Sequence, residues 1–245
     1  MENQNQETGI QQLELTKRQE RACRILEAAS TLILRWGYNK TTIDDIARQA
    51  GVAKGTIYLH WKTREELFKA LLKRERLEHA RDFQRRVLDD PNGSTLRGIT
   101  KHSVLAMAKR PLLKAILLGD MDILGKLAPG ERNTEAYAER LVGFKAYLEL
   151  LRHYGLVRID LSLQAEVHIW SAVFAGFFLG APLMPDEFML PDDELADLMA
   201  ETIQCALETG AQLSSEGLTA ISQIFTGYLE QGVAVLEEQF QQAIS

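Results

Sequence analysis

The side chains that could do chemistry in this chain are concentrated in the segment KGTIYLHWK, residues 54–62. If this segment forms a short helix anchored by Ile57, its outward side chains can donate hydrogen bonds to DNA. Lys54 can reach the O6 and N7 atoms of guanine, and Thr56 can reach a base edge or a phosphate. A glycine between them has no Cβ, so the backbone can approach the DNA closely. With one residue from the preceding helix, the candidate DNA contacts are Thr42, Lys54, Gly55, Thr56, Tyr58, His60 and Lys62.

A pair of short helices must position these side chains. Thr42 can cap the first of them, in which apolar residues recur on one face between positions 43 and 50. Gly51 follows directly, and glycine tolerates the left-handed conformation that ends many helices. The second helix is expected over residues 52–61. The pattern predicts a helix-turn-helix over about residues 41–60, a motif that lays its second helix in the major groove.

The rest of the chain is expected to be helical. A Thr-x-x-Glu capping box at Thr63 opens a long helix to about Leu88, and Pro91-Asn92-Gly93 ends this part of the chain. No run alternates apolar and polar residues for long enough to form a strand, so the predicted fold class is all-α. Besides a first helix over about residues 16–36, the expected helices span about residues 95–109, 111–127, 131–154, 162–180, 192–212 and 215–243.

Charge is distributed unevenly along the chain. The net charge is −6, yet residues 17–64 contain ten Lys or Arg against four Asp or Glu, a local balance of +6. The remaining residues therefore carry −12. A basic amino-terminal segment beside an acidic remainder fits phosphate contacts that are confined to one end of the molecule.

Several other classes of protein are disfavoured. Cys23 and Cys205 are far apart and form neither a metal spacing nor a disulfide framework, which suits a reducing cytoplasm. No pair of histidines has the i, i+4 spacing of a zinc helix, so no metal or cofactor is expected. The amino terminus lacks the pattern of a secretory signal. The most apolar run, residues 169–184, is shorter than the roughly 18 residues of a membrane span and is interpreted as a buried core helix.

Short helix pairs with a glycine turn also occur in proteins that do not bind DNA, where Tyr58 and Trp61 would be core aromatics and His60 a surface side chain. The residues themselves favour DNA binding. The run TTIDDIARQAGVAKGTIYLHWKTREELF closely resembles the amino-terminal domain of TetR-family transcriptional regulators, over about residues 18–78. The match includes the paired threonines, the I-A-x-x-A-G-V core, K-G-T-I-Y, the His-aromatic-Lys exit and the following E-E-L-F.

The resemblance implies that the seven candidate contacts touch DNA. Trp61 stands where the family usually has phenylalanine, which still permits packing. Asp44 stands where the family sometimes has a basic base-reading residue, and an acid there does not suit that contact. The resemblance also implies a carboxy-terminal body that binds a small effector and forms a homodimer. The expected division is a flexible leader over residues 1–16, a DNA-binding domain over 17–78, and an effector-binding and dimerisation domain over 79–245.

There is also a physical reason to expect a dimer. Two recognition helices about 34–36 Å apart can read a palindrome, which raises affinity and specificity together. Small residues recur every four positions from Ala172, so another helix can approach closely there. Packing of the same faces within one chain remains the alternative. The predicted two-fold interface consists of Ala172, Gly176, Gly180, Leu195, Met199, Ile203 and Ala206.

Aromatic and soft side chains gather on the helices after residue 100. Such a pocket would favour a hydrophobic effector, with His102 and His168 as polar groups that can donate and accept hydrogen bonds. At helical spacing these residues can equally be ordinary core. The expected effector site consists of His102, Met107, Met121, Tyr137, Phe144, Trp170, Phe174 and Phe177.

The leading hypothesis is a cytoplasmic, ligand-responsive regulator, most often a repressor in the family, that binds a palindromic operator as a homodimer. A small hydrophobic effector would release it, with the helix over about residues 63–88 transmitting the movement. One alternative is a constitutive DNA-binding adaptor whose helical domain binds a protein partner. The other is a helical enzyme with an incidental helix-turn-helix, although the sequence has no nucleophile elbow and no phosphate loop.

Overall fold

Helices account for most of the described residues in the computed structural model, which covers residues 2–125, 135–211 and 214–244 and gives only the backbone of residues 2–15, 135–142 and 182. In the described part, extended pairing is limited to one isolated bridge between Val157 and Glu208. The predicted all-α class is therefore confirmed. The elements are α1 (Glu2–Trp36), α2 (Ile43–Ala50), α3 (Lys54–His60), α4 (Arg64–Asp89), α5 (Leu96–Ala108), α6 (Pro111–Leu118), α7 (Met121–Leu124), α9 (Glu135–His153), α10 (Leu163–Gly180), η2 (Ala181–Leu183), η3 (Asp186–Phe188), α11 (Asp192–Leu207) and α12 (Ser215–Ile244).

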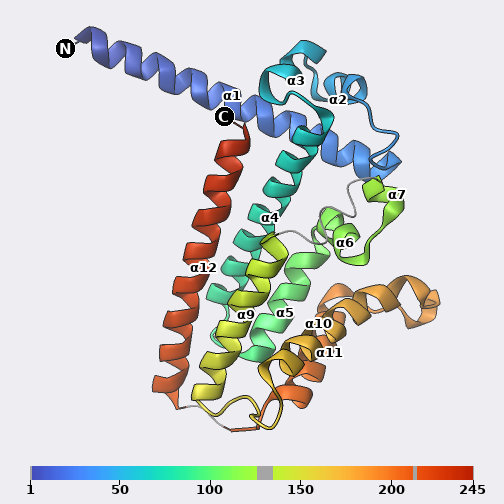
Figure 1. Ribbon diagram of the computed structural model, residues 1–245, viewed down its shortest axis with the longest axis vertical. Helices are drawn as coiled ribbons and strands as arrows, with labels where there is room; N and C mark the ends of the chain where they lie inside the picture. Colours follow the sequence, from blue (N-terminus) through green and yellow to red (C-terminus); the bar gives the residue numbers. More distant parts are fainter. Residues whose placement is uncertain (1, 126–134, 212–213, 245) are drawn as a thin grey trace.

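The second half of α1, with α2, α3 and the first turns of α4, forms a small unit that we call the head (Figure 1). α2 begins with a capping box, in which the Thr42 side chain accepts a hydrogen bond from the Asp45 N–H and the Asp45 carboxylate accepts one from the Thr42 N–H. It ends at Gly51, whose φ of 66° is the left-handed conformation that glycine tolerates. The core of the head includes Ile25, Leu26, Ile46, Ile57, Leu67, Phe68 and Leu71.

The remaining helices form a longer unit, the body, around two buried clusters. α5 packs against α11 and α4, and α10 packs against α9, α11 and α6. One cluster surrounds Tyr147 and Leu148, and the other surrounds Phe174 and Met199. α4 leads from the head into the body, while α12 runs beside α4 and returns to end next to α1 (Figure 1).

The first helix is longer than expected, because α1 begins at Glu2 instead of about residue 16. Residues 2–15 are rich in Gln, Glu and Leu, which are good helix formers. The proposed limits at residues 16 and 78 stay predictions, and α4 passes through the second of them without a break.

Two later boundaries also differ from expectation. The helix expected over 111–127 is interrupted, because Gly119 ends α6 with a φ of 66° and the Asp120 side chain then caps α7. α11 ends at Leu207, before the expected residue 212, since Glu208 turns into the bridge with Val157.

Candidate nucleic-acid interface

α3 has one buried face and one exposed face, as the sequence predicts. Ile57 is fully buried in the core of the head, and Trp61 is buried just beyond the end of the helix. Lys54 and Tyr58 are exposed, and Thr56 is half-buried. The short helix therefore presents polar side chains outward from an apolar anchor, as a helix must to enter a groove of DNA.

Thr42 and Lys62 are exposed on either side of this helix pair. The Thr42 hydroxyl donates to the Asp45 carboxylate at 2.6 Å, so it already has a partner within the protein. Hydrogen bonds from Thr42, followed by the nearby Arg48 charge, hold the pKa of Asp45 below its usual value despite some desolvation. The capping box is thus fixed, and it orients the start of α2. The Lys62 N–H donates to the Glu66 carboxylate at 2.8 Å, which ties this residue to the start of α4.

Gly55 is exposed, and the fold gives no reason for glycine there. A Cβ added at this position would meet no atom within 4 Å, and the residue is not among the glycines with positive φ. Glycine lowers helix stability by about 1 kcal/mol relative to alanine in a helix interior. The absence of a side chain at this point of α3 therefore keeps open a surface that the protein itself does not fill.

Lys54 forms an ion pair with Asp44 across the two helices, with 2.8 Å between Nζ and Oδ2. The hydrogen bond and charge of Asp44 raise the pKa of Lys54. Both side chains are at least half exposed, so the pair contributes little to stability. Asp44 instead places a negative charge beside the cation that was predicted to contact DNA.

His60 does not take the exposed position that its predicted role requires. Both of its ring nitrogens are buried, and the ring lies 5.2 Å from that of Trp61. Burial, followed by the charges of Arg18 and Arg21, lowers the pKa of His60, whereas the Ile244 backbone acts in the opposite direction. A neutral ring with buried nitrogens cannot reach a phosphate, so we remove His60 from the candidate DNA contacts.

Leu59 is a surface residue of α3 that the sequence analysis missed. Its side chain is 68% exposed, the most exposed large apolar side chain on the head. The Arg18 guanidinium donates to the Leu59 carbonyl at 3.3 Å and so joins α1 to the end of α3. The signal was present in the spacing, because Leu59 lies two residues and therefore about 200° around the helix from buried Ile57. An apolar side chain here can contact a thymine methyl group.

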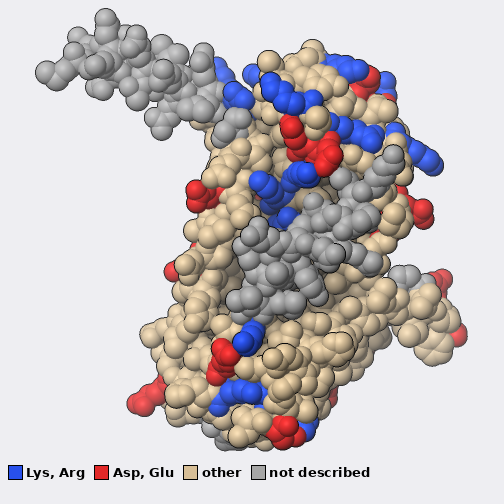
Figure 2. All heavy atoms as spheres, viewed as in Figure 1, with Lys and Arg blue, Asp and Glu red and all other residues tan. Residues whose placement is uncertain are grey.

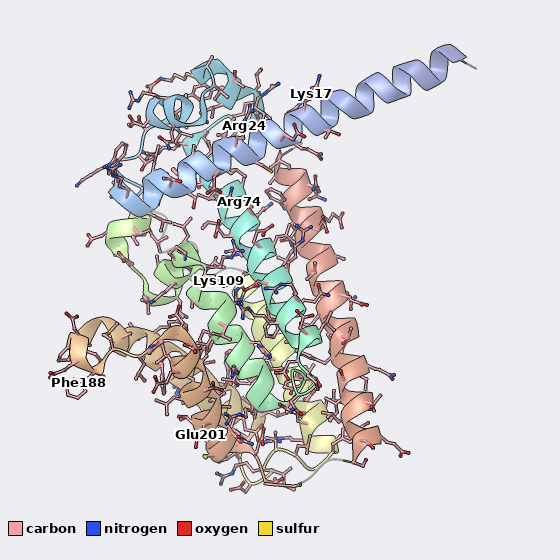
Figure 3. The ribbon with its side chains drawn as sticks, turned by 180° about the vertical axis from the view of Figure 1, so that it is seen from behind. Lys17, Arg24, Arg74, Lys109, Phe188 and Glu201 are labelled. Atoms are coloured by element: carbon pink, nitrogen blue, oxygen red, sulfur yellow. The ribbon has the colours of Figure 1, made fainter. Side chains whose placement is uncertain are left out.

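Basic side chains gather on the head, as the local charge balance predicts (Figure 2). Two of them, Lys17 and Arg24, project from α1 (Figure 3). The helix pair therefore lies within a positively charged end of an otherwise acidic molecule. The exposed basic residues of this end include Lys17, Arg18, Arg24, Arg35, Lys40, Arg48, Lys54 and Lys62.

Part of the predicted effector site comes together in the body. The Phe144 and Trp170 ring centroids are 4.5 Å apart, and those of Trp170 and Phe174 are 4.9 Å apart and stacked. The Trp170 indole N–H donates to the Thr100 hydroxyl at 3.2 Å. This gives a continuous aromatic cluster with one polar anchor. The predicted residues that lie in the two body clusters are Met107, Phe144, Trp170, Phe174 and Phe177.

The other predicted effector residues do not join this cluster. Met121 is 57% exposed on α7, which packs against α1 and α6, so it lies apart from the aromatic cluster. The His102 ring is buried, and its Nε2 atom lies 2.8 Å from the Asp90 carboxylate. One of the two ring nitrogens of His102 therefore already has a partner within the protein. His168 is exposed on α10. The side chain of Tyr137 lies outside the described residues.

The predicted dimer residues divide between the surface and the core. On α10, Ala172 and Gly176 are exposed and Gly180 is half-buried. On α11, Met199 and Ile203 are buried within the chain because their side of the helix packs against α5. The burial of these two residues favours the alternative of packing within one chain. Leu195 and Ala206 remain half-buried on α11.

Comparisons with known proteins give the same assignment for the head. Residues 25–71 match the family model described as bacterial regulatory proteins, tetR family. The chain is 26% identical over 161 residues to the HTH-type transcriptional repressor BepR of Brucella suis biovar 1 (strain 1330), which covers 62% of this chain and 76% of BepR. Two regulators of Bacillus subtilis (strain 168) are more similar, 52% and 45% identical, but only over 23% and 25% of their own length.

Solved structures share the fold over about four fifths of the chain. A complex of SmeT with triclosan has a TM-score of 0.64 at 21% identity, and the alignment covers 80% of this chain and 96% of SmeT. FadR from Bacillus subtilis in complex with stearoyl-CoA has a TM-score of 0.58 at 19% identity, covering 78% of this chain and 99% of FadR. The relatives with assigned roles are regulators of transcription. Residues 25–71 therefore carry the domain of the tetR family of bacterial regulatory proteins, and these comparisons together support a transcriptional regulator of that family.

Proposed function

We propose that this regulator reads an operator with α3 and that a small ligand held in the body controls the reading. The observation that carries the first part is Gly55, a surface glycine that the fold does not require, placed between Lys54 and Thr56 in a basic surface. The contacts that we retain are Thr42, Lys54, Gly55, Thr56, Tyr58 and Lys62, and we add Leu59. Because BepR and SmeT are both named as repressors, we propose repression as the mode of regulation.

The ion pair between Lys54 and Asp44 provides the experiment that tests this proposal. We expect Lys54→Ala to weaken binding to a duplex selected by the full chain from a randomised library by about 5–150-fold, because one direct contact is lost. We expect Asp44→Asn to strengthen binding by about three- to tenfold, since it removes an anion beside the DNA and frees Lys54. Fluorescence titrations at several salt concentrations would measure both effects.

The two variants control for each other, because each one breaks the same ion pair. If the pair were only a surface salt bridge, both changes would cost a similar 0 to about 1 kcal/mol of folding stability and leave DNA affinity unchanged. Opposite effects on affinity with equal helicity and similar melting temperatures support a DNA-facing position. Equal effects would contradict it.

We further propose a homodimer formed through the exposed face of α10 and the connection that follows it. α10 is apolar enough to meet the length and composition of a membrane span, yet only 17% of its residues are buried within one chain. The helix packs against three others in the body, which favours a protein partner over lipid. Phe188 lies at the tip of the projecting connection (Figure 3). The exposed apolar side chains of this region are Leu179, Leu183, Met184, Phe188, Met189, Leu190 and Leu198.

The effector that we propose is a hydrophobic or aromatic molecule bound beside the cluster of Phe144, Trp170 and Phe174. Two proteins of the same fold support this, since one is a complex with triclosan and the other a complex with stearoyl-CoA. A coupling free energy of about 1–3 kcal/mol between effector binding and operator binding would change operator affinity by roughly 5–150-fold. We expect melting temperature to rise with members of a panel of aromatic compounds and acyl-CoA esters. No shift across the panel would count against this effector class.

A further inference from the structure

The last helix of the chain ends inside the core of the head. Phe240 and Ile244 of α12 are 7% and 1% exposed and belong to the same cluster as Ile46, Ile57 and Phe68. Phe240 therefore shares one small core with Ile57, and Ile244 shares it with Ile25, although each pair lies far apart in the sequence. In both ribbon views α12 runs up to α1 at the head (Figures 1 and 3). The unit that carries α3 is therefore not complete without the end of α12.

Polar contacts fix this end of α12 as well. The Trp61 indole N–H donates to the Ala243 carbonyl at 2.8 Å. Carbonyls in the last turn of a helix have no partner within that helix, so Trp61, the residue that follows α3, supplies one for α12. On α1, the Gln19 side-chain amide donates to that of Gln241 at 2.8 Å.

The other end of α12 lies in the body. Ile221 is 1% exposed, and Phe225 packs on Tyr147 and Phe83 with ring centroids 4.8 and 6.4 Å away. Between these ends, Arg81 of α4 pairs with Glu237 at 2.7 Å. α12 has 30 residues and is therefore about 45 Å long. One continuous helix joins the aromatic cluster of the body to the core of the head.

We infer that α12 positions the DNA-reading helix, with Trp61, Phe240 and Ile244 as positioning residues that do not contact DNA. This inference rests on the proposed function of α3. Loss of the contacts at Ile244 would leave the body intact and allow α3 and its neighbours to move. The fraction of molecules whose head matches the operator would then fall, and the apparent affinity would fall with it.

Two isoleucines of α12 provide a matched test, since Ile221 and Ile244 are each 1% exposed and lie at opposite ends of the helix. We expect Ile244→Ala to weaken binding to the selected duplex by about tenfold or more and to accelerate amide hydrogen exchange in α2 and α3. We expect Ile221→Ala to lower the melting temperature while leaving the affinity within about twofold of wild type. Binding is measured at a temperature at which circular dichroism shows both variants to be folded.

The exchange measurement separates this inference from the proposed function. If the wild-type chain selected no duplex, the proposed function would fail. The docking of α12 would still be supported if amide exchange in the head became faster in Ile244→Ala but not in Ile221→Ala. Wild-type affinity and exchange in Ile244→Ala, or equal losses of affinity in both variants, would overturn the inference. Trp61→Phe serves as a milder second variant, because it keeps an aromatic side chain while it removes the hydrogen bond to Ala243 and part of the buried ring. We expect a loss of about threefold, and unchanged affinity with unchanged exchange would count against the role of Trp61.

Discussion

Replacing Gly55 by leucine is expected to leave the protein folded and to remove nearly all of its operator binding. The position is open, so the new side chain meets no atom of the protein within 4 Å of its Cβ. Leucine is a better helix former than glycine, and the free energy of unfolding should therefore stay the same or rise by up to about 1 kcal/mol. On the DNA side, the side chain would occupy the space between α3 and the bases. We expect operator affinity to fall by at least about 100-fold, the loss of one to two good base contacts.

In Gly55→Leu, folding stability and operator affinity are expected to change in opposite directions. Gly55→Ala should give an intermediate loss of affinity, because it adds only a methyl group. Thermal melts and fluorescence titrations on the same samples would measure both quantities. Wild-type affinity in Gly55→Leu would show that α3 does not approach DNA through this face. Unfolding of the variant would contradict the open environment that the structure assigns to Gly55.

Replacing Gly176 by arginine is expected to convert the proposed dimer into monomers. Gly176 is exposed on α10, and an added Cβ would meet no atom within 4 Å, so a single chain can accommodate the change. In a two-fold interface the same residue occurs on both subunits, which brings two unpaired cations into an apolar contact. A monomer binds only one half-site, so operator affinity should fall on the order of 1000-fold. Sedimentation equilibrium would measure the mass, and a titration would measure the affinity.

α12 supplies a matched control for this experiment. Gly232 is also exposed and open, and it lies near exposed Tyr228 and Val235 on the same helix. We expect Gly232→Arg to remain a dimer with wild-type affinity. If Gly232→Arg dissociated while Gly176→Arg stayed dimeric, the interface would lie on α12 and the assignment to α10 would be wrong.

The sequence predicts the helix pair well because its signals are local. Thr42 and Gly51 cap α2 through hydrogen bonds and backbone angles that depend on neighbouring residues only, and both caps occur in the structure. The buried position of Ile57 follows from helical periodicity in the same way. The DNA contacts themselves stay predictions, although their exposure is consistent with the role at every position except His60.

What the sequence analysis missed depends on contacts between distant parts of the chain. The ring nitrogens of His60 are buried where α12 returns to the head, and no local pattern encodes that contact. Met199 and Ile203 lie on an apolar face of α11 that fits α5 of the same chain as well as it would fit a partner. Met121 was grouped with the aromatic residues by composition, whereas the left-handed Gly119 turns α7 away to the surface. Leu59 is the exception, because its spacing from Ile57 could have shown that it is exposed.

The most direct test of the central claim is a selection of DNA duplexes from a randomised library by the full chain, followed by sequencing and by a measurement of stoichiometry. A homodimer that reads DNA with α3 predicts enrichment of an inverted repeat whose half-sites lie about one helical turn, or 34–36 Å, apart, with two chains bound per duplex. Gly55→Leu should enrich no sequence in the same experiment. Failure of the wild-type chain to enrich any sequence, or equal enrichment by Gly55→Leu, would contradict the claim.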